Sequence, residues 1–136
     1  MEVAASLLTL VQAAAVLISA TRQLSRKLRS APEELHALTA QLLVVQSELK
    51  RIKEATGRTH EELMTDELRQ AISDAFLLAR TGLSELDDVV DRAHGNRQIR
   101  DRVRWLRKEQ KLAEKGLSKI KSACGSLLVL MQVISW

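Results

Sequence analysis

The chain has 136 residues and a formal net charge of +4. This length fits one domain with a substantial core and excludes two independent domains. Aromatic residues make up only 2% of the chain, whereas Leu, Ala, Lys, Arg, Glu, Gln and Ser dominate, a composition typical of long helices. Cys124 is the single cysteine and cannot form an internal disulfide, which favours a reducing compartment such as the cytosol. We expect one all-helical domain.

The first predicted helix covers residues 2–29 and carries no charge from Val3 to Thr21. A stretch of this kind is either the innermost helix of a soluble bundle or a helix that enters a bilayer, since at 1.5 Å per residue it spans about 28 Å. A cleaved signal peptide is disfavoured because Met1-Glu2 is acidic where a positive charge is required. The apolar residues form a main stripe and a second stripe beside it. These are Val3, Leu7, Leu10, Ala14, Leu17, Leu24 and Leu28, and then Leu8, Val11, Ala15 and Ile18.

Three more helices are expected at residues 32–56, 60–94 and 98–135. Ala31-Pro32 separates the first two helices, because the residue before a proline avoids the helical conformation. Thr56-Gly57 ends the second helix. Its inner face has heptad spacing. That face consists of Leu35, Leu38, Leu42, Val45, Leu49 and Ile52.

The start of the third helix has two candidates. Thr59 with Glu62 has the spacing of a capping box, and Thr65-Asp66 offers a start six residues later. His94-Gly95-Asn96 ends this helix. Its inner face consists of Leu68, Ile72, Phe76, Ala79, Leu83, Leu86 and Val90, and its outer face is acidic through Asp74, Glu85, Asp87, Asp88 and Asp91.

The fourth helix keeps an unbroken apolar spacing from Ile99 to Ile134 and is predicted to be the longest. Gly116 and Gly125 lower its helix propensity and permit a bend. Four long helices with short connections predict an antiparallel, up-down-up-down four-helix bundle with a long C-terminal helix.

Motifs for catalysis or metal binding are missing from the sequence. It contains no phosphate-binding loop, no nucleophile elbow, no HExxH and no paired cysteines. The three histidines, His36, His60 and His94, fall at helix ends in different segments, where solvent-facing roles are more common than metal ligation. Cys124 occupies a position on an inner face and is expected to be a small core residue. We therefore expect a protein that is not an enzyme and has no cofactor, metal site or small-molecule substrate.

Basic residues concentrate between Arg97 and Lys121, where ten Lys or Arg stand against three acids. One interpretation is neutralisation of the acidic third helix by the adjacent fourth helix. The other is a surface for an anionic partner, for which lipid is favoured over nucleic acid because no set of base-stacking aromatic residues is present. The candidate basic surface consists of Arg97, Arg100, Arg104, Arg107, Lys108 and Lys111.

Transfer energies place the first helix near the balance point between water and membrane. Its eight larger apolar side chains favour insertion by roughly 2 to 5 kcal/mol in sum, while Gln12 and the hydroxyl residues oppose it. A constitutive anchor would be more decisively apolar. The helix can lie in the core of a soluble bundle or in a bilayer, depending on whether other helices or lipids cover it.

The opening residues Met1 to Leu8, the alanine-rich apolar helix, the basic turn and the segment Ala31 to Leu35 that leads into a leucine-heptad helix resemble a known family. This family is the fungal HeLo-like N-terminal domain of STAND (NLR-like) proteins, which is related in plan to HeLo and to the four-helix domain of the mixed-lineage kinase-like necroptosis pseudokinase. The resemblance covers essentially the whole chain. It implies a domain that executes programmed cell death or heterokaryon incompatibility. Such a domain is inactive in the cytoplasm until an attached sensor or amyloid-templating region, absent from these residues, oligomerises it.

The resemblance also implies a division of roles. The first helix would permeabilise the plasma membrane through Val3, Leu7, Leu8, Leu10, Val11, Ala14, Leu17 and Ile18, and the phospholipid headgroups would be contacted by Arg22, Arg26, Lys27 and Arg29. A charge on the least buried side of this helix, placed at a site such as Leu10 or Ala14, is expected to abolish membrane damage without unfolding the bundle. The rival hypothesis is a non-lytic helical adaptor whose first helix stays buried.

Overall fold

The computed structural model describes residues 3–27, 33–56, 64–95 and 110–134. These ranges contain four α-helices and no strands, namely α1 (Val3–Lys27), α2 (Glu33–Thr56), α3 (Asp66–Gly95) and α5 (Gln110–Ile134). The expected all-helical fold class is confirmed. The proposed stop at Ala31-Pro32 and the segment 98–109 of the predicted fourth helix lie outside the described residues.

The third helix begins at the later of the two predicted positions. Met64 and Thr65 precede α3 without helical structure. The backbone N–H of Leu68 donates to Thr65 Oγ1 at 3.2 Å, so Thr65 caps the helix and satisfies one of its free N–H groups. The predicted start near residue 60 is therefore wrong, because the cap that the chain uses is Thr65.

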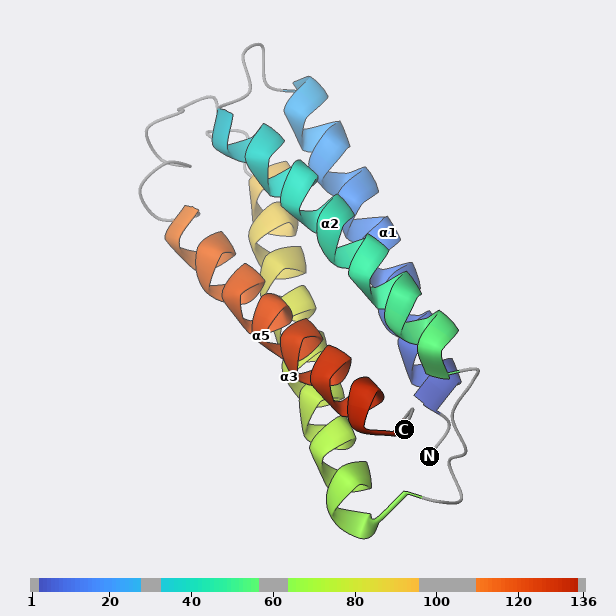
Figure 1. The fold of residues 1–136 in the computed structure, drawn as a ribbon. Coiled ribbons are helices and arrows are strands. Elements are labelled where there is room, and N and C mark those ends of the chain that lie inside the picture. Colours follow the sequence, from blue (N-terminus) through green and yellow to red (C-terminus); the bar gives the residue numbers. More distant parts are fainter. Residues whose placement is uncertain (1–2, 28–32, 57–63, 96–109, 135–136) are drawn as a thin grey trace.

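Consecutive helices run in opposite directions, and the Val3 end of α1 lies at the same end of the bundle as the Ile134 end of α5 (Figure 1). α1 packs on α2 and α3, while α5 packs on α3 and α2. The order around the bundle is therefore α1, α2, α5, α3. Two neighbouring pairs are antiparallel, and the pairs α1–α3 and α2–α5 are parallel (Figure 1). In the simplest up-down bundle, by contrast, α2 would lie beside α3.

One apolar core fills the space between the helices. Every inner-face residue predicted for α2 is buried, and so are those of α3 except Leu68, which is half-buried. Cys124 is fully buried, as expected. The stripe of α1 continues through a residue that hydropathy does not single out, since Thr21 is fully buried and donates from Oγ1 to the Leu17 carbonyl oxygen at 2.7 Å. The buried stripe of α1 is thus Val3, Leu7, Leu10, Ala14, Leu17, Thr21 and Leu24.

α3 and α5 approach each other closely where two glycines meet. A Cβ atom added at Gly82 would lie 2.6 Å from the Gly116 carbonyl oxygen and 2.6 Å from Ile120 Cγ1. The absence of a side chain therefore lets the two backbones touch. Gly116, which was expected to permit a bend, instead forms this contact within a continuous helix.

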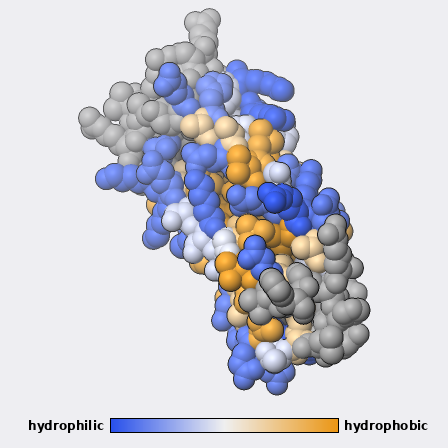
Figure 2. Space-filling model, viewed as in Figure 1, coloured by the Kyte–Doolittle hydropathy of each residue, from blue (hydrophilic) through white to orange (hydrophobic). Residues whose placement is uncertain are grey.

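The longest helix in the described part of the chain is α3, with 30 residues, whereas α5 has 25. The expectation that the fourth helix is the longest depended on residues 98–109, which lie outside the described residues. The surface over α2 and α5 is mostly hydrophilic, with hydrophobic side chains in a discontinuous band along it (Figure 2).

Alanine substitutions at two glycines of these helices should have opposite effects on stability. Gly82→Ala is expected to lower the free energy of unfolding by about 1 to 3 kcal/mol, because the new methyl group must push two backbones apart. Gly125→Ala should raise it by up to about 1 kcal/mol, since a Cβ there meets nothing within 4 Å and alanine favours the helix. Urea unfolding followed by circular dichroism measures both changes. Equal effects of the two substitutions would contradict the close crossing at Gly82.

Candidate functional site

α1 has a buried side and an exposed side, and neither carries a charge before Arg22. Its exposed side is partly apolar, with Val16 65% exposed and Leu8 41% exposed. We call this side the outer face of α1. It consists of Ala5, Leu8, Thr9, Gln12, Ala13, Ala15, Val16 and Ser19.

The outer face of α1 differs from the exposed side of α3. On α3 the solvent-facing positions include Asp74, Asp87, Asp88 and Asp91, as the sequence predicted. A helix that packs in a soluble bundle normally has charged residues on its exposed side. α3 follows this rule, and the uncharged part of α1 does not. Within the described residues, α1 also contains the one segment, Ala5–Arg26, that is long and apolar enough to cross a membrane, and 33% of its most apolar window is buried.

The structure divides the eight residues predicted for membrane insertion into two groups. Leu8 is exposed and Val11 is half-buried. The other six are buried in the core against α2 and α3. They are Val3, Leu7, Leu10, Ala14, Leu17 and Ile18.

The sites suggested for a charge substitution that spares the bundle, Leu10 and Ala14, are wrong. Leu10 is 1% exposed and Ala14 is fully buried, so a charge at either position would lack both water and a partner. The least buried side of α1 is the outer face, with Val16 near its centre. The positions of the outer face recur with helical spacing in the sequence. Charge does not distinguish them, however, because the buried side of the helix is uncharged as well.

The predicted headgroup contacts lie at the C-terminal end of α1. Arg22 and Arg26 are exposed and stand four residues apart, which places them on the same side of the helix. Lys27 is the last residue of α1, and its side chain, like Arg29, lies outside the described residues. The outer face of α1 is therefore followed directly by two exposed positive charges.

Of the candidate basic surface between Arg97 and Lys111, only Lys111 falls within the described residues, and it is exposed. Further along α5, Lys119 forms an ion pair with Glu85 of α3. This pair supports the interpretation that adjacent helices neutralise each other. Lys121 donates from Nζ to Gln41 Oε1 of α2 at 2.8 Å. Lys119 and Lys121 thus each link α5 to a neighbouring helix.

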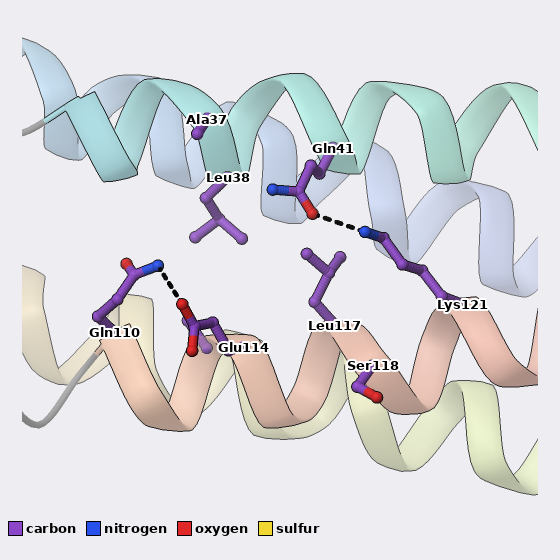
Figure 3. A pocket seen from close by; sticks show the side chains of 9 residues that line it. Ala37, Leu38, Gln41, Gln110, Glu114, Leu117, Ser118 and Lys121 are labelled. Atoms are coloured by element: carbon purple, nitrogen blue, oxygen red, sulfur yellow. Dashed lines mark hydrogen bonds between the residues drawn. The ribbon is translucent and has the colours of Figure 1, made fainter.

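A hollow of about 370 Å³ lies between α2 and α5 (Figure 3). Leu38 and Leu117 point into it from the two helices, and the Gln41–Lys121 hydrogen bond crosses it. At one end Gln110 donates from Nε2 to Glu114 Oε1 at 3.2 Å, while its buried Oε1 has no hydrogen-bond partner among the described residues. The hollow brings together the amides of Gln41 and Gln110, the amine of Lys121, the carboxylate of Glu114 and the hydroxyl of Ser118.

Cys124 lies in the core beside Glu48 of α2. Burial first, and then the charge of Glu48 and the hydrogen bond between its carboxylate and the thiol, raise the pKa of the Cys124 thiol to about 12. The neutral thiol is therefore the stable form, which makes this cysteine a poor nucleophile. The described residues contain no group of three or more His, Cys, Asp or Glu arranged to hold a metal ion.

Comparison with known proteins gives no family assignment. No family model, curated protein or solved structure matches the chain. The resemblance to HeLo-like domains therefore stands on the sequence pattern alone, and function has to be argued from α1 and its surroundings.

Stability should fall at alkaline pH through Cys124. The thiol ionises near pH 9 in the unfolded chain and near pH 12 in the folded one, so the unfolded state loses its proton first as the pH rises. The difference lowers the free energy of unfolding by about 1 kcal/mol at pH 10 relative to pH 7. Urea unfolding of the wild type and of Cys124→Ala at both pH values isolates this effect. An identical pH dependence in the two proteins would contradict it.

Proposed function

We propose that this chain is a membrane-targeting, membrane-permeabilising (pore-forming) domain of fungal programmed cell death or heterokaryon incompatibility, as its resemblance to HeLo-like domains implies. The observation that carries the proposal is α1, a helix long enough to cross a bilayer whose outer face is uncharged and exposed from Ala5 to Ser19. Folding of the bundle does not require this face to be uncharged, because charged residues would be tolerated at its exposed positions.

The outer face is suited to the first contact with a bilayer. Leu8 and Val16 can enter the interfacial region while α1 is still packed on the core, since both are exposed. Arg22 and Arg26 then lie where anionic headgroups would attract them, by about 1 kcal/mol per charge. This arrangement favours an anionic phospholipid surface such as the cytoplasmic leaflet of the plasma membrane.

Insertion requires the buried stripe of α1 to leave α2 and α3. Lipid tails are as apolar as the leucines of the core, so the stripe exchanges one apolar environment for another. The backbone of α1 keeps its hydrogen bonds in the bilayer because it remains helical. The main cost of insertion is then the apolar surface that α1 uncovers on the rest of the bundle.

Self-association reduces this cost, because copies of the bundle that have released α1 can bury their uncovered apolar surfaces against one another. Oligomerisation through an attached sensor or amyloid-templating region would thus convert a cytoplasmic bundle into a membrane-bound assembly. Nucleic acid has no role in this proposal, and neither does a small-molecule substrate or a cofactor.

The alternative is a non-lytic adaptor domain of a STAND receptor. The alanines of the outer face favour it, because small side chains let the backbone of a partner helix come close. The two functions differ in whether the membrane is breached. Leakage of vesicles by the clustered chain therefore separates them.

A charge in the outer face should prevent leakage, whereas the same charge elsewhere should not. Val16 in α1 is 65% exposed and Val129 in α5 is 60% exposed, so Val16→Asp and Val129→Asp are matched substitutions that leave the core intact. An aspartate near the centre of an inserted helix costs about 2.5 to 3.5 kcal/mol. We expect Val16→Asp to lower the rate of leakage at least tenfold and Val129→Asp to change it by less than about twofold.

Each protein is fused to a chemically inducible dimeriser and added to dye-loaded phosphatidylcholine vesicles with or without phosphatidylserine. Leakage should require the inducer and increase with phosphatidylserine. Circular dichroism verifies that both variants keep the helical fold. Equal loss of leakage in the two variants would show that any exposed charge interferes, and full leakage by Val16→Asp would remove α1 from the mechanism. No leakage by the clustered wild type would favour the adaptor.

A further inference from the structure

The four helix interfaces of the bundle differ in extent. α3 packs most extensively on α5, and α1 packs more extensively on α2 than on α3. The interface between α2 and α5 is the least extensive of the four. Each helix is therefore held mainly by its antiparallel neighbour. We call α1 and α2 the first hairpin, and α3 and α5 the second hairpin.

The second hairpin is joined at the level of its backbones. Gly82 and Gly116 meet with no side chain between them, and the ion pair Lys119–Glu85 spans the same two helices. Such a close contact forms only while the two helices cross at this point, so any separation of α3 from α5 loses it completely. We therefore expect the second hairpin to resist separation.

The hollows at the interfaces between the hairpins are lined mainly by polar side chains, whereas a larger hollow of about 660 Å³ between α3 and α5 is lined mainly by apolar ones. At α2–α5 lies the hollow crossed by the Gln41–Lys121 hydrogen bond. Gln110 Oε1 lies at its end and has no hydrogen-bond partner in the part of the chain that the structure describes (Figure 3). At α1–α3 lies a second hollow, of about 390 Å³. It is lined by Ser6, Thr9, Leu10, Ser73, Phe76 and Arg80.

Polar groups at these interfaces make their separation less costly. A buried oxygen that no described residue hydrogen-bonds, such as Gln110 Oε1, gains a hydrogen bond from water when the interface opens. The hydroxyl and guanidinium groups of the α1–α3 hollow are also readily hydrated. Inside the second hairpin, opening would instead break a backbone contact that water cannot replace.

We infer that the bundle opens along the plane between the two hairpins, so that α1 leaves α3 together with α2 rather than by itself. The opening is a property of the fold. Its consequence, exposure of the buried stripe of α1 to a membrane, rests on the proposed function.

Native-state hydrogen exchange of the full chain tests the opening without a membrane. With increasing urea below the unfolding transition, we expect the slowest amides of α1 and α2 to converge on one opening free energy with one urea dependence. Those of α3 and α5 should converge on a higher value. Opening of α1 at a lower free energy than α2, or convergence of all four helices on a single value, would overturn the inference.

Cross-linking tests the consequence for leakage. In a Cys124→Ala background, Ser6→Cys with Ser73→Cys joins the two hairpins across one hollow. The matched control, Ala71→Cys with Ser126→Cys, joins α3 to α5 across another hollow that these two residues line. Each pair is closed with a bis-maleimide, the intramolecular product is verified by its mass, and clustered protein is applied to phosphatidylserine vesicles.

We expect the first cross-link to lower leakage at least tenfold and the control cross-link to change it by less than about twofold. If the uncross-linked proteins leak and both cross-links block leakage equally, or neither does, the opening plane is wrong. If no uncross-linked protein leaks at all, the proposed function fails, and hydrogen exchange alone decides the inference.

Discussion

Burial of one apolar stripe from each of four helices in a shared core is the constraint on which the rest of this structure depends. In α1 the stripe follows heptad positions from Val3 to Leu24, and Thr21 occupies one of them by bonding its hydroxyl to the preceding turn. Each fully buried leucine contributes about 1.5 to 3 kcal/mol. This constraint determines only one side of each helix. The opposite side is free to carry whatever function requires, so the contrast between the acidic exterior of α3 and the uncharged outer face of α1 bears on function rather than on folding.

Periodicity predicts the stripes well because burial of leucines repeats with the turns of the helix. Leu35 to Ile52 in α2 and Ile72 to Val90 in α3 lie in the core as their spacing indicates. Periodicity does not determine which helices become neighbours. The position of α1 beside α3, with α2 beside α5, depends on contacts between residues far apart in sequence, such as Gln41 with Lys121. The start of α3 was ambiguous for a different reason, since two threonine caps compete locally and only the backbone geometry selects Thr65.

The candidate site could be predicted only as a helix. An uncharged sequence indicates that α1 can be buried in a core or a bilayer, but charge does not separate its exposed side from its buried one. Leu10 and Ala14 belong to the main apolar stripe and face the core, so they are unsuitable for a charge substitution, whereas Val16, near the centre of the outer face, is exposed. The buried stripe of α1 and its outer face differ in average residue size, since the buried stripe has four leucines and the outer face has mostly smaller side chains. This difference in size can be interpreted only after the helices that pack on α1 are known.

The arrangement of the hairpins bears on how a nearly balanced helix can act as a switch. If α1 left alone, α2 would lose its main partner and the core would be open on one side, with no element able to close it. Separation between the hairpins instead exposes two complementary surfaces at once, one on each hairpin. A second copy that has opened in the same way offers the matching surface to each of them. Under the proposed function, clustering would therefore lower the cost of opening without any change in α1 itself. It would let a helix with only a small intrinsic preference for lipid remain buried in isolated copies and be released in an assembly.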